Sequence, residues 1–131
     1  MCLDHLHHDS KNVIDTLAKK ADGDGYIWLW KVFDVKTDDT LVAQFHNYSF
    51  YEGKNTARGK IAKELYGDKA DVQYTPGFHC YITKTNARYW KKVSRDNNRE
   101  KIIVPIKVKK EWITSVGYQA GIVVVCKHII I

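Results

Sequence analysis

The sequence has few cysteines and no long hydrophobic run. Its three cysteines, Cys2, Cys80 and Cys126, are an odd number at spacings unlike those of metal motifs, so we expect no disulfide framework. The longest aliphatic run, Ile122 to Val125, is far shorter than the roughly 20 residues that span a bilayer. The N-terminus lacks the basic segment and apolar run of a signal peptide. We therefore expect a cytoplasmic protein.

Length and composition fit a single domain. A chain of 131 residues, of which 44% are hydrophobic, can form one core that buries roughly two thirds of the unfolded surface. We predict one domain over 1–131, in which residues 1–9 could remain a flexible N-terminal segment. No cofactor motif is present, because GKNTARGK at 53–60 has five residues between Gly and Gly-Lys and lacks the following Ser or Thr of a phosphate-binding loop.

The positive charge is concentrated in one segment. The net charge is +6, and Lys84 to Lys110 contains ten Lys or Arg residues against two acidic residues. Met1 to Thr83 contains ten basic and twelve acidic residues. Such a basic segment attracts nucleic acid, nucleotide phosphates or an acidic protein surface, but it could also be a solvated face that serves solubility.

The first nine residues, MCLDHLHHD, contain the strongest candidates for metal ligands. Thiolate and imidazole are the usual ligands of zinc, so Cys2, His5, His7 and His8 could form a site. The alternative is an N-terminal segment held by its leucines. We expect no metal site, because the pattern lacks the final histidine of the HxHxDH signature and no core strand precedes it.

Periodicity predicts an α+β fold. We expect a twisted, mostly antiparallel sheet of about five strands with two or three short helices packed mostly on one face. Strands are predicted at 26–35, 40–51, 78–83, 101–109 and 121–131, and helices at 10–20, 56–66 and 85–92. Pro105 cannot donate to a ladder, so the strand at 101–109 is predicted at an edge or with a bulge. The apolar C-terminal strand needs cover on both faces or a partner subunit, which favours a homo-oligomer.

The chain is organised around residues 74–92, YTPGFHCYITKTNARYWKK. A half-buried strand after Pro76-Gly77 leads into a basic helix that Thr83 or Thr85 can cap. Aromatic rings can stack on a base while Lys and Arg hold phosphates. We therefore predict a site for a small anionic, nucleotide-like ligand, formed by Lys54, Arg58, His79, Tyr81, Thr83, Arg88, Tyr89, Trp90 and Lys91. The alternative for Tyr89 and Trp90 is the core-facing side of the helix.

Catalysis has one weak candidate. His79 lies on the polar face of its predicted strand, near the basic helix, and could act as a general acid or base. No nucleophile lies in a recognisable motif. We expect a binding protein rather than an enzyme, with a nucleotide-processing hydrolase as a further alternative.

The order of short motifs resembles one group of proteins. An MCL start, a WKV-type strand, a central GFHCYIT strand, KIIVPIKVKK and GIVVVCKHIII are similar to small accessory proteins of bacteriophages and prophages. This resemblance implies a phage-encoded accessory or anti-defence protein in the host cytoplasm that sequesters a nucleotide signal. The alternative is an inhibitor that binds a host protein through its basic face.

Overall fold

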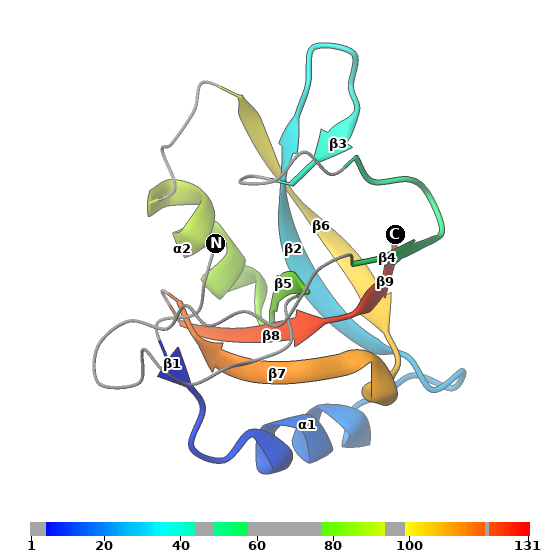
Figure 1. Cartoon of the computed structure of the whole chain (residues 1–131), viewed down its shortest axis with the longest axis vertical. Helices are drawn as coiled ribbons and strands as arrows, with labels where there is room; N and C mark the ends of the chain where they lie inside the picture. Colours follow the sequence, from blue (N-terminus) through cyan, green and yellow to red (C-terminus); the bar gives the residue numbers. More distant parts are fainter. Residues whose placement is uncertain (1–4, 44–48, 58–76, 94–98, 120) are drawn as a thin grey trace.

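The computed structural model describes residues 5–43, 49–57, 77–93, 99–119 and 121–131. Within them the chain forms an α+β fold in which antiparallel strands belong to one sheet and two α-helices pack against it (Figure 1). The elements in chain order are β1 (His5–Leu6), α1 (Ser10–Lys19), β2 (Ile27–Val35), β3 (Leu41–Val42), β4 (Lys54–Thr56), β5 (Phe78–Tyr81), α2 (Lys84–Val93), β6 (Glu100–Val108), the 3-10 helix η2 (Lys110–Trp112), β7 (Ile113–Tyr118), β8 (Ile122–Cys126) and β9 (His128–Ile130). The strand order is β1-β7-β8-β5-β2-β6-β9-β4, and β3 pairs with β2.

Strand β2 lies in the middle of the sheet, as its aromatic and β-branched residues predict. It pairs with β6 without a break from Ile27↔Val108 to Val35↔Glu100. It also forms a hairpin with β3, in which Val35 lies opposite Leu41. Residues 44–48 of the predicted returning strand lie outside the described residues.

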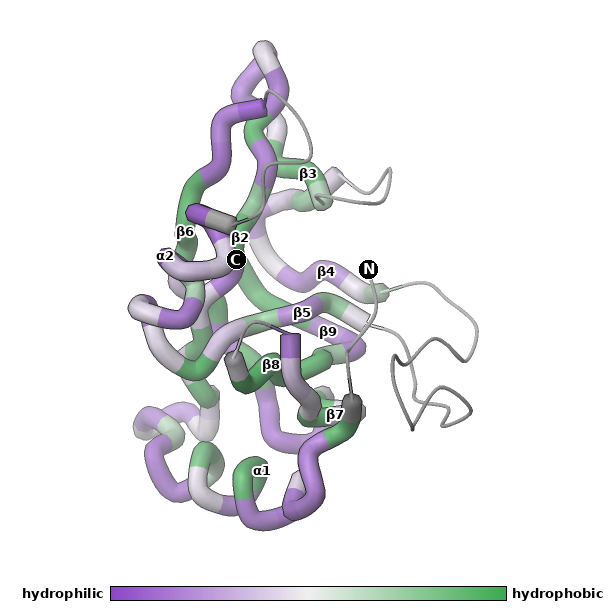
Figure 2. The backbone as a smooth tube through the Cα atoms, turned by 90° about the vertical axis from the view of Figure 1, so that its left-hand side faces the viewer, coloured by the Kyte–Doolittle hydropathy of each residue, from purple (hydrophilic) through white to green (hydrophobic). Residues whose placement is uncertain are grey.

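The sheet is strongly curled. Only Lys127 separates β8 from β9, yet β8 pairs with β5 and β7 whereas β9 pairs with β6 and β4. The hydrophobic side chains of β2, β5, β6 and β8 gather on the concave face, where Leu29, Phe33 and Ile106 have no exposed surface. Figure 2 shows β8 as hydrophobic along its length, as expected for a strand that is buried on both faces.

The two helices pack against different faces, so the prediction of helices mostly on one face is wrong. Leu17 of α1 joins the core that contains Leu29 and Phe33, whereas Ala87 of α2 packs with Val32 on the opposite side of β2. Alternation along β2 gives the sheet two apolar faces, and each needs a helix to cover it. The first helix begins at Ser10, as predicted, and Asp9 is its N-cap residue.

Several strands were missed or misplaced. The count of about five strands is too low, because residues 113–118, for which no strand is predicted, form β7 and pair with β8. The edge position predicted from Pro105 is wrong for the strand as a whole, since β6 lies between β2 and β9, but it holds locally beside Pro105. Among the described residues β9 pairs with β6 only at Lys107↔Ile130, so the proline is tolerated where the ladder is one-sided. Thr56 ends β4 instead of beginning the helix predicted at 56–66. Residues 58–66 lie outside the described residues.

The C-terminal strand is covered within the chain. Val123, Val124, Val125 and Cys126 of β8 have no exposed surface, and Ile129 of β9 is equally buried. The apolar segment that favoured a homo-oligomer is therefore accounted for by the fold, and the assembly stays a prediction. Among the described residues no helix is both long and apolar enough to cross a membrane.

Candidate functional site

Helix α2 carries the basic residues of the central stretch on one side. Its N-terminus is capped as predicted, because the Thr83 Oγ1 accepts a hydrogen bond from the Asn86 N–H at 3.1 Å. Ala87 and Trp90, three residues apart, face the sheet and pack against the cluster that contains Val32. The basic side chains of α2 therefore lie on the exposed side of the helix.

A groove of about 450 Å³ lies along this exposed side. Four cationic side chains and one sheet residue line it, namely Lys84, Arg88, Lys91, Lys92 and Ile103. The cations are spaced by four, three and one residues, which places them along one stripe of a helix. The Lys84 Nζ also lies 5.2 Å from the centroid of the Trp30 ring. We call this feature the α2 groove.

A second groove, of about 600 Å³, is chemically different. It lies at the β2–β3 turn and is lined by Val35, Lys36, Thr37, Asp38, Asp39, Arg99 and Glu100. Three of these seven side chains are carboxylates, so they offset the charge of its cations. The α2 groove is the better site for an anion.

The predicted aromatic residues have different positions. Tyr81 is 1% exposed and lies beneath α2, and its buried hydroxyl has no hydrogen-bond partner among the described residues. Burial raises the pKa of this hydroxyl. Trp90 is packed on the core side of α2, which is the structural alternative for that residue, whereas Tyr89 is 55% exposed. Tyr89 is thus the predicted aromatic residue of this helix that is open to a ligand.

His79 lies apart from the α2 groove. Its Nδ1 is 3.1 Å from the Oε1 of Gln119, at the turn between β7 and β8. Its backbone carbonyl accepts a hydrogen bond from the Lys31 Nζ at 3.0 Å. These contacts give His79 a structural role in joining strands, and its acid-base role stays a prediction.

The other predicted residues do not join α2. Lys54 lies in β4, with its Nζ 5.1 Å from the centroid of the Trp112 ring, and Arg58 lies outside the described residues. Among the metal candidates, Cys2 lies outside the described residues, and His5 pairs with Tyr118 in β1. The rings of His7 and His8 stack at 4.6 Å. Within the described part of the chain no group of three His, Cys, Asp or Glu residues could hold a metal ion.

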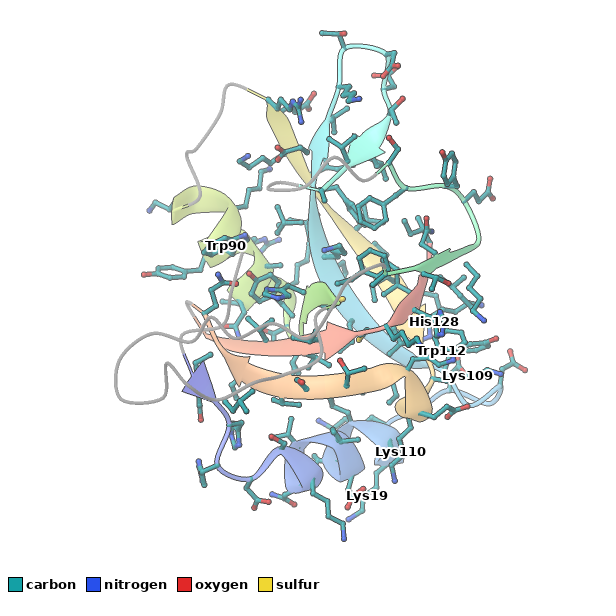
Figure 3. All side chains as sticks on the ribbon, in the orientation of Figure 1. Lys19, Trp90, Lys109, Lys110, Trp112 and His128 are labelled. Atoms are coloured by element: carbon teal, nitrogen blue, oxygen red, sulfur yellow. The ribbon has the colours of Figure 1, made fainter. Side chains whose placement is uncertain are left out.

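The sequence interpretation missed a second basic surface, which lies on the sheet. We call it the aromatic–lysine surface, and it consists of Tyr26, Trp28, Lys54, Lys107, Lys109, Trp112 and His128. Figure 3 shows Lys109, Trp112 and His128 together where η2 meets β9, well away from Trp90 on α2. The signal in the sequence was the alternation of Tyr26 and Trp28 with buried residues, matched by Lys107 and Lys109 on another strand. This alternation indicates a shared surface only when the pairing of β2 with β6 is known.

Lys31 is a lysine whose amine lies among the aromatic rings of the core. Lys31 lies on the concave face of β2 and is 8% exposed, with its Nζ 5.4 to 5.9 Å from three phenylalanine ring centroids, those of Phe33, Phe50 and Phe78. Burial lowers the pKa of Lys31, and the neighbouring thiols of Cys80 and Cys126 partly oppose this shift. Burial raises the pKa of the Cys126 thiol. The Lys31 amine belongs neither to the α2 groove nor to the aromatic–lysine surface. Because it is buried, we expect it to affect the stability of the fold.

Comparisons of the chain with protein-family models, with curated proteins and with solved structures found no match. The residues and geometry of the chain itself are therefore the basis for any functional proposal.

Proposed function

We propose that this protein binds a small anionic ligand of the nucleotide class, with the phosphates of the ligand in the α2 groove. The observation that carries the proposal is the lining of this groove by Lys84, Arg88, Lys91 and Lys92, with no carboxylate among the lining residues that the structure describes. Four cations held on one helix attract a ligand with several phosphates more strongly than one with a single phosphate.

The groove also limits how the ligand is held. Arg88 can contact a phosphate in a bidentate manner, whereas each lysine acts as a point charge. Trp30 lies beside Lys84, and Tyr89 is exposed on the same helix. Binding in this groove is therefore expected to depend mainly on phosphates, with base identity a smaller factor.

Isothermal titration calorimetry with tripolyphosphate, ATP, ADP, AMP and adenosine tests the proposal. We expect affinity to fall in that order, with adenosine unbound. The double variant Arg88→Ala/Lys91→Ala should weaken ATP binding at least about tenfold, because each hydrogen bond between charged groups contributes about 1.5–3 kcal/mol.

The matched control is Lys11→Ala/Lys19→Ala, which removes the same charge from α1. Both positions are exposed, so this variant should bind ATP nearly as the wild type does. Equal losses in the two double variants would show that net charge alone attracts the anion. A flat titration with all five ligands would overturn the proposal.

A protein partner is the second candidate function. Tyr89 is 55% exposed in the middle of a basic helix, and exposed Tyr and Arg side chains are common at the centres of interfaces. An inhibitor that binds an acidic protein surface would lose affinity in Tyr89→Ala, whereas ATP binding would change little. The origin of the chain in a bacteriophage and its role against host defence stay predictions.

Turnover of the ligand is tested in the same samples. Mass spectrometry of ATP recovered after incubation should find it intact for a binding protein. A nucleotide-processing hydrolase would consume it, and His79→Ala would then stop the reaction if His79 is the acid or base.

A further inference from the structure

One row of side chains crosses four strands of the sheet. The register places Trp28 of β2 opposite Lys107 of β6, Lys107 opposite Ile130 of β9, and Ile130 opposite Lys54 of β4. Partners in a register point to the same side of a sheet. None of these four side chains is buried, so this side of the sheet is open to solvent along the row.

The positions between them face the other way and are buried. Ile27, Val108, Ile129 and Asn55 are each 2% exposed or less. The open face therefore belongs to a well-packed part of the sheet. Among the aromatic residues of this surface, Trp112 also packs against the core, whereas Trp28 is 52% exposed.

Aromatic rings and lysines alternate over this surface. The Lys107 Nζ lies 4.6 Å from the Tyr26 ring centroid and 5.8 Å from that of Trp28. The Lys109 Nζ lies 5.8 Å from Tyr26 and 5.7 Å from Trp112. The rings of Tyr26 and Trp112 are 6.3 Å apart. Each of these lysines thus lies between two rings.

Hydrogen bonds fix two of the rings. The Trp28 Nε1 donates to the Asp22 Oδ2 at 2.9 Å, and the Thr56 Oγ1 is 2.8 Å from the His128 Nδ1. The His128 ring packs against Trp112 at 5.4 Å, edge to face. A surface whose rings are already oriented loses less side-chain entropy when a ligand stacks on them.

We propose that the aromatic–lysine surface binds single-stranded nucleic acid. Exposed rings stack on bases of any sequence, and interleaved lysines contact the phosphates between those bases. A duplex does not fit, because its bases are already stacked and paired. Four strands span about 14 Å at their usual spacing of about 4.8 Å, which is more than one nucleotide covers and favours an extended strand.

Fluorescence anisotropy with labelled oligothymidylate and oligouridylate of about 20 nucleotides, and with a duplex of the same length, tests the proposal. We expect both single strands to bind and the duplex to bind at least about tenfold more weakly. Comparison of the two single strands distinguishes DNA from RNA as the source of the ligand. Affinity should fall steeply between about 50 mM and about 200 mM salt.

Trp28→Ala and Tyr89→Ala form a matched pair, because these aromatic residues are 52% and 55% exposed and lie on different surfaces. Trp28→Ala should weaken single-strand binding by about fivefold to 100-fold, and Trp28→Phe should retain most of the affinity. Tyr89→Ala should leave it unchanged. Equal effects of the two alanine variants would overturn the proposal.

A charge variant tests the same surface independently of Trp28. Lys54→Gln/Lys107→Gln should reduce the magnitude of the negative slope of log affinity against log salt by about 1.4, since each phosphate contact to a single strand contributes about 0.7. Lys11→Gln/Lys19→Gln on α1 should leave the slope unchanged. Thermal unfolding of each variant checks that the sheet is intact. Tight duplex binding, no binding of either single strand, or equal slopes in the two charge variants would overturn the proposal.

This inference does not depend on the α2 groove. Arg88→Ala/Lys91→Ala should leave oligonucleotide affinity within about twofold of the wild type, as expected for sites without shared residues. A loss of both ATP and oligonucleotide binding in that variant would mean that one site on α2 binds both ligands, and would overturn the proposal for the sheet.

Discussion

The α2 groove and the aromatic–lysine surface are both basic, but they are assembled differently. The cations of the groove come from one helix of ten residues. The seven residues of the other surface come from β2, β4, β6, η2 and β9 and from the segments beside them. The cations of the helix are neighbours in the sequence, whereas those of the sheet are brought together by strand pairing.

The two surfaces also use aromatic residues differently. On α2 the aromatic Trp90 faces the core, so the groove offers mainly charge. On the sheet, alternation turns Trp28 outward while Ile27 and Leu29 are buried. The helix is therefore suited to phosphates, and the sheet to bases together with phosphates.

The largest effect should come from weakening the β2–β6 ladder, which supports both the α2 groove and the aromatic–lysine surface. The Lys101 Nζ and Asp34 Oδ1 form an ion pair at 2.8 Å in the buried part of the β2–β6 ladder. Asp34→Ala should lower the free energy of unfolding by about 3–5 kcal/mol, because it removes the carboxylate that neutralises the buried Lys101 amine.

Urea unfolding measures this loss, and Asp24→Ala, an exposed position, is the control. Asp34→Ala/Lys101→Met should recover much of the stability, since it removes both charges. A loss below about 1 kcal/mol in Asp34→Ala would show that the pair is not important for the ladder.

The second-largest effect concerns Lys31, which belongs neither to the α2 groove nor to the aromatic–lysine surface. Burial lowers the pKa of Lys31 from its ordinary value of 10.5, so the unfolded state binds more protons in the window between the lowered pKa and 10.5. The free energy of unfolding should therefore rise with pH across this window.

Lys31→Met should remove that rise and add about 1–4 kcal/mol of stability at neutral pH, as observed when buried charges are replaced by apolar residues. Lys36→Met, at an exposed position, is the control. The difference between wild type and variant in urea unfolding as a function of pH isolates Lys31 from the thiols. A constant difference over the window would contradict the lowered pKa.

A smaller effect should separate the two surfaces. Thr83→Ala removes the hydrogen bond to the Asn86 N–H and should cost about 1 kcal/mol of stability. Fraying at the start of α2 displaces Lys84, so ATP binding should weaken while oligonucleotide binding stays the same. Thr83→Ser should behave as the wild type in calorimetry and anisotropy. Weaker binding of both ligands in Thr83→Ala would show that the two surfaces are coupled.

The smallest effect lies within the aromatic–lysine surface. Burial lowers the pKa of His128, and the charges of Lys54 and Lys127 lower it further. Lys54→Gln should raise this pKa in an NMR titration, whereas Lys36→Gln should not change it. Bound oligothymidylate should also raise it, because phosphates stabilise the imidazolium. An unchanged pKa in Lys54→Gln would place Lys54 too far from the ring to act.

Local patterns predicted what depends on neighbours in the chain. Periodicity predicted strands at 26–35, 78–83 and 101–109, where β2, β5 and β6 lie, and the Thr83 cap was predicted from its position before a basic helix. The same patterns did not show that Tyr81 and Trp90 pack beneath α2, because a polar or aromatic residue on a half-buried face can turn either to solvent or under a helix. Only the packing of α2 on that face decides which of these happens.

The sequence by itself determined an α+β fold, a central strand at 26–35, two of its helices and a basic α2, because these features follow from residue periodicity and local charge. The tertiary structure alone decided that β8 and β9 curl the sheet, that Lys31 is buried, and that Lys54 and His128 lie beside Trp112. The physical reason is register: each pairing joins residues that are far apart in the chain, and no local pattern specifies which strands become neighbours.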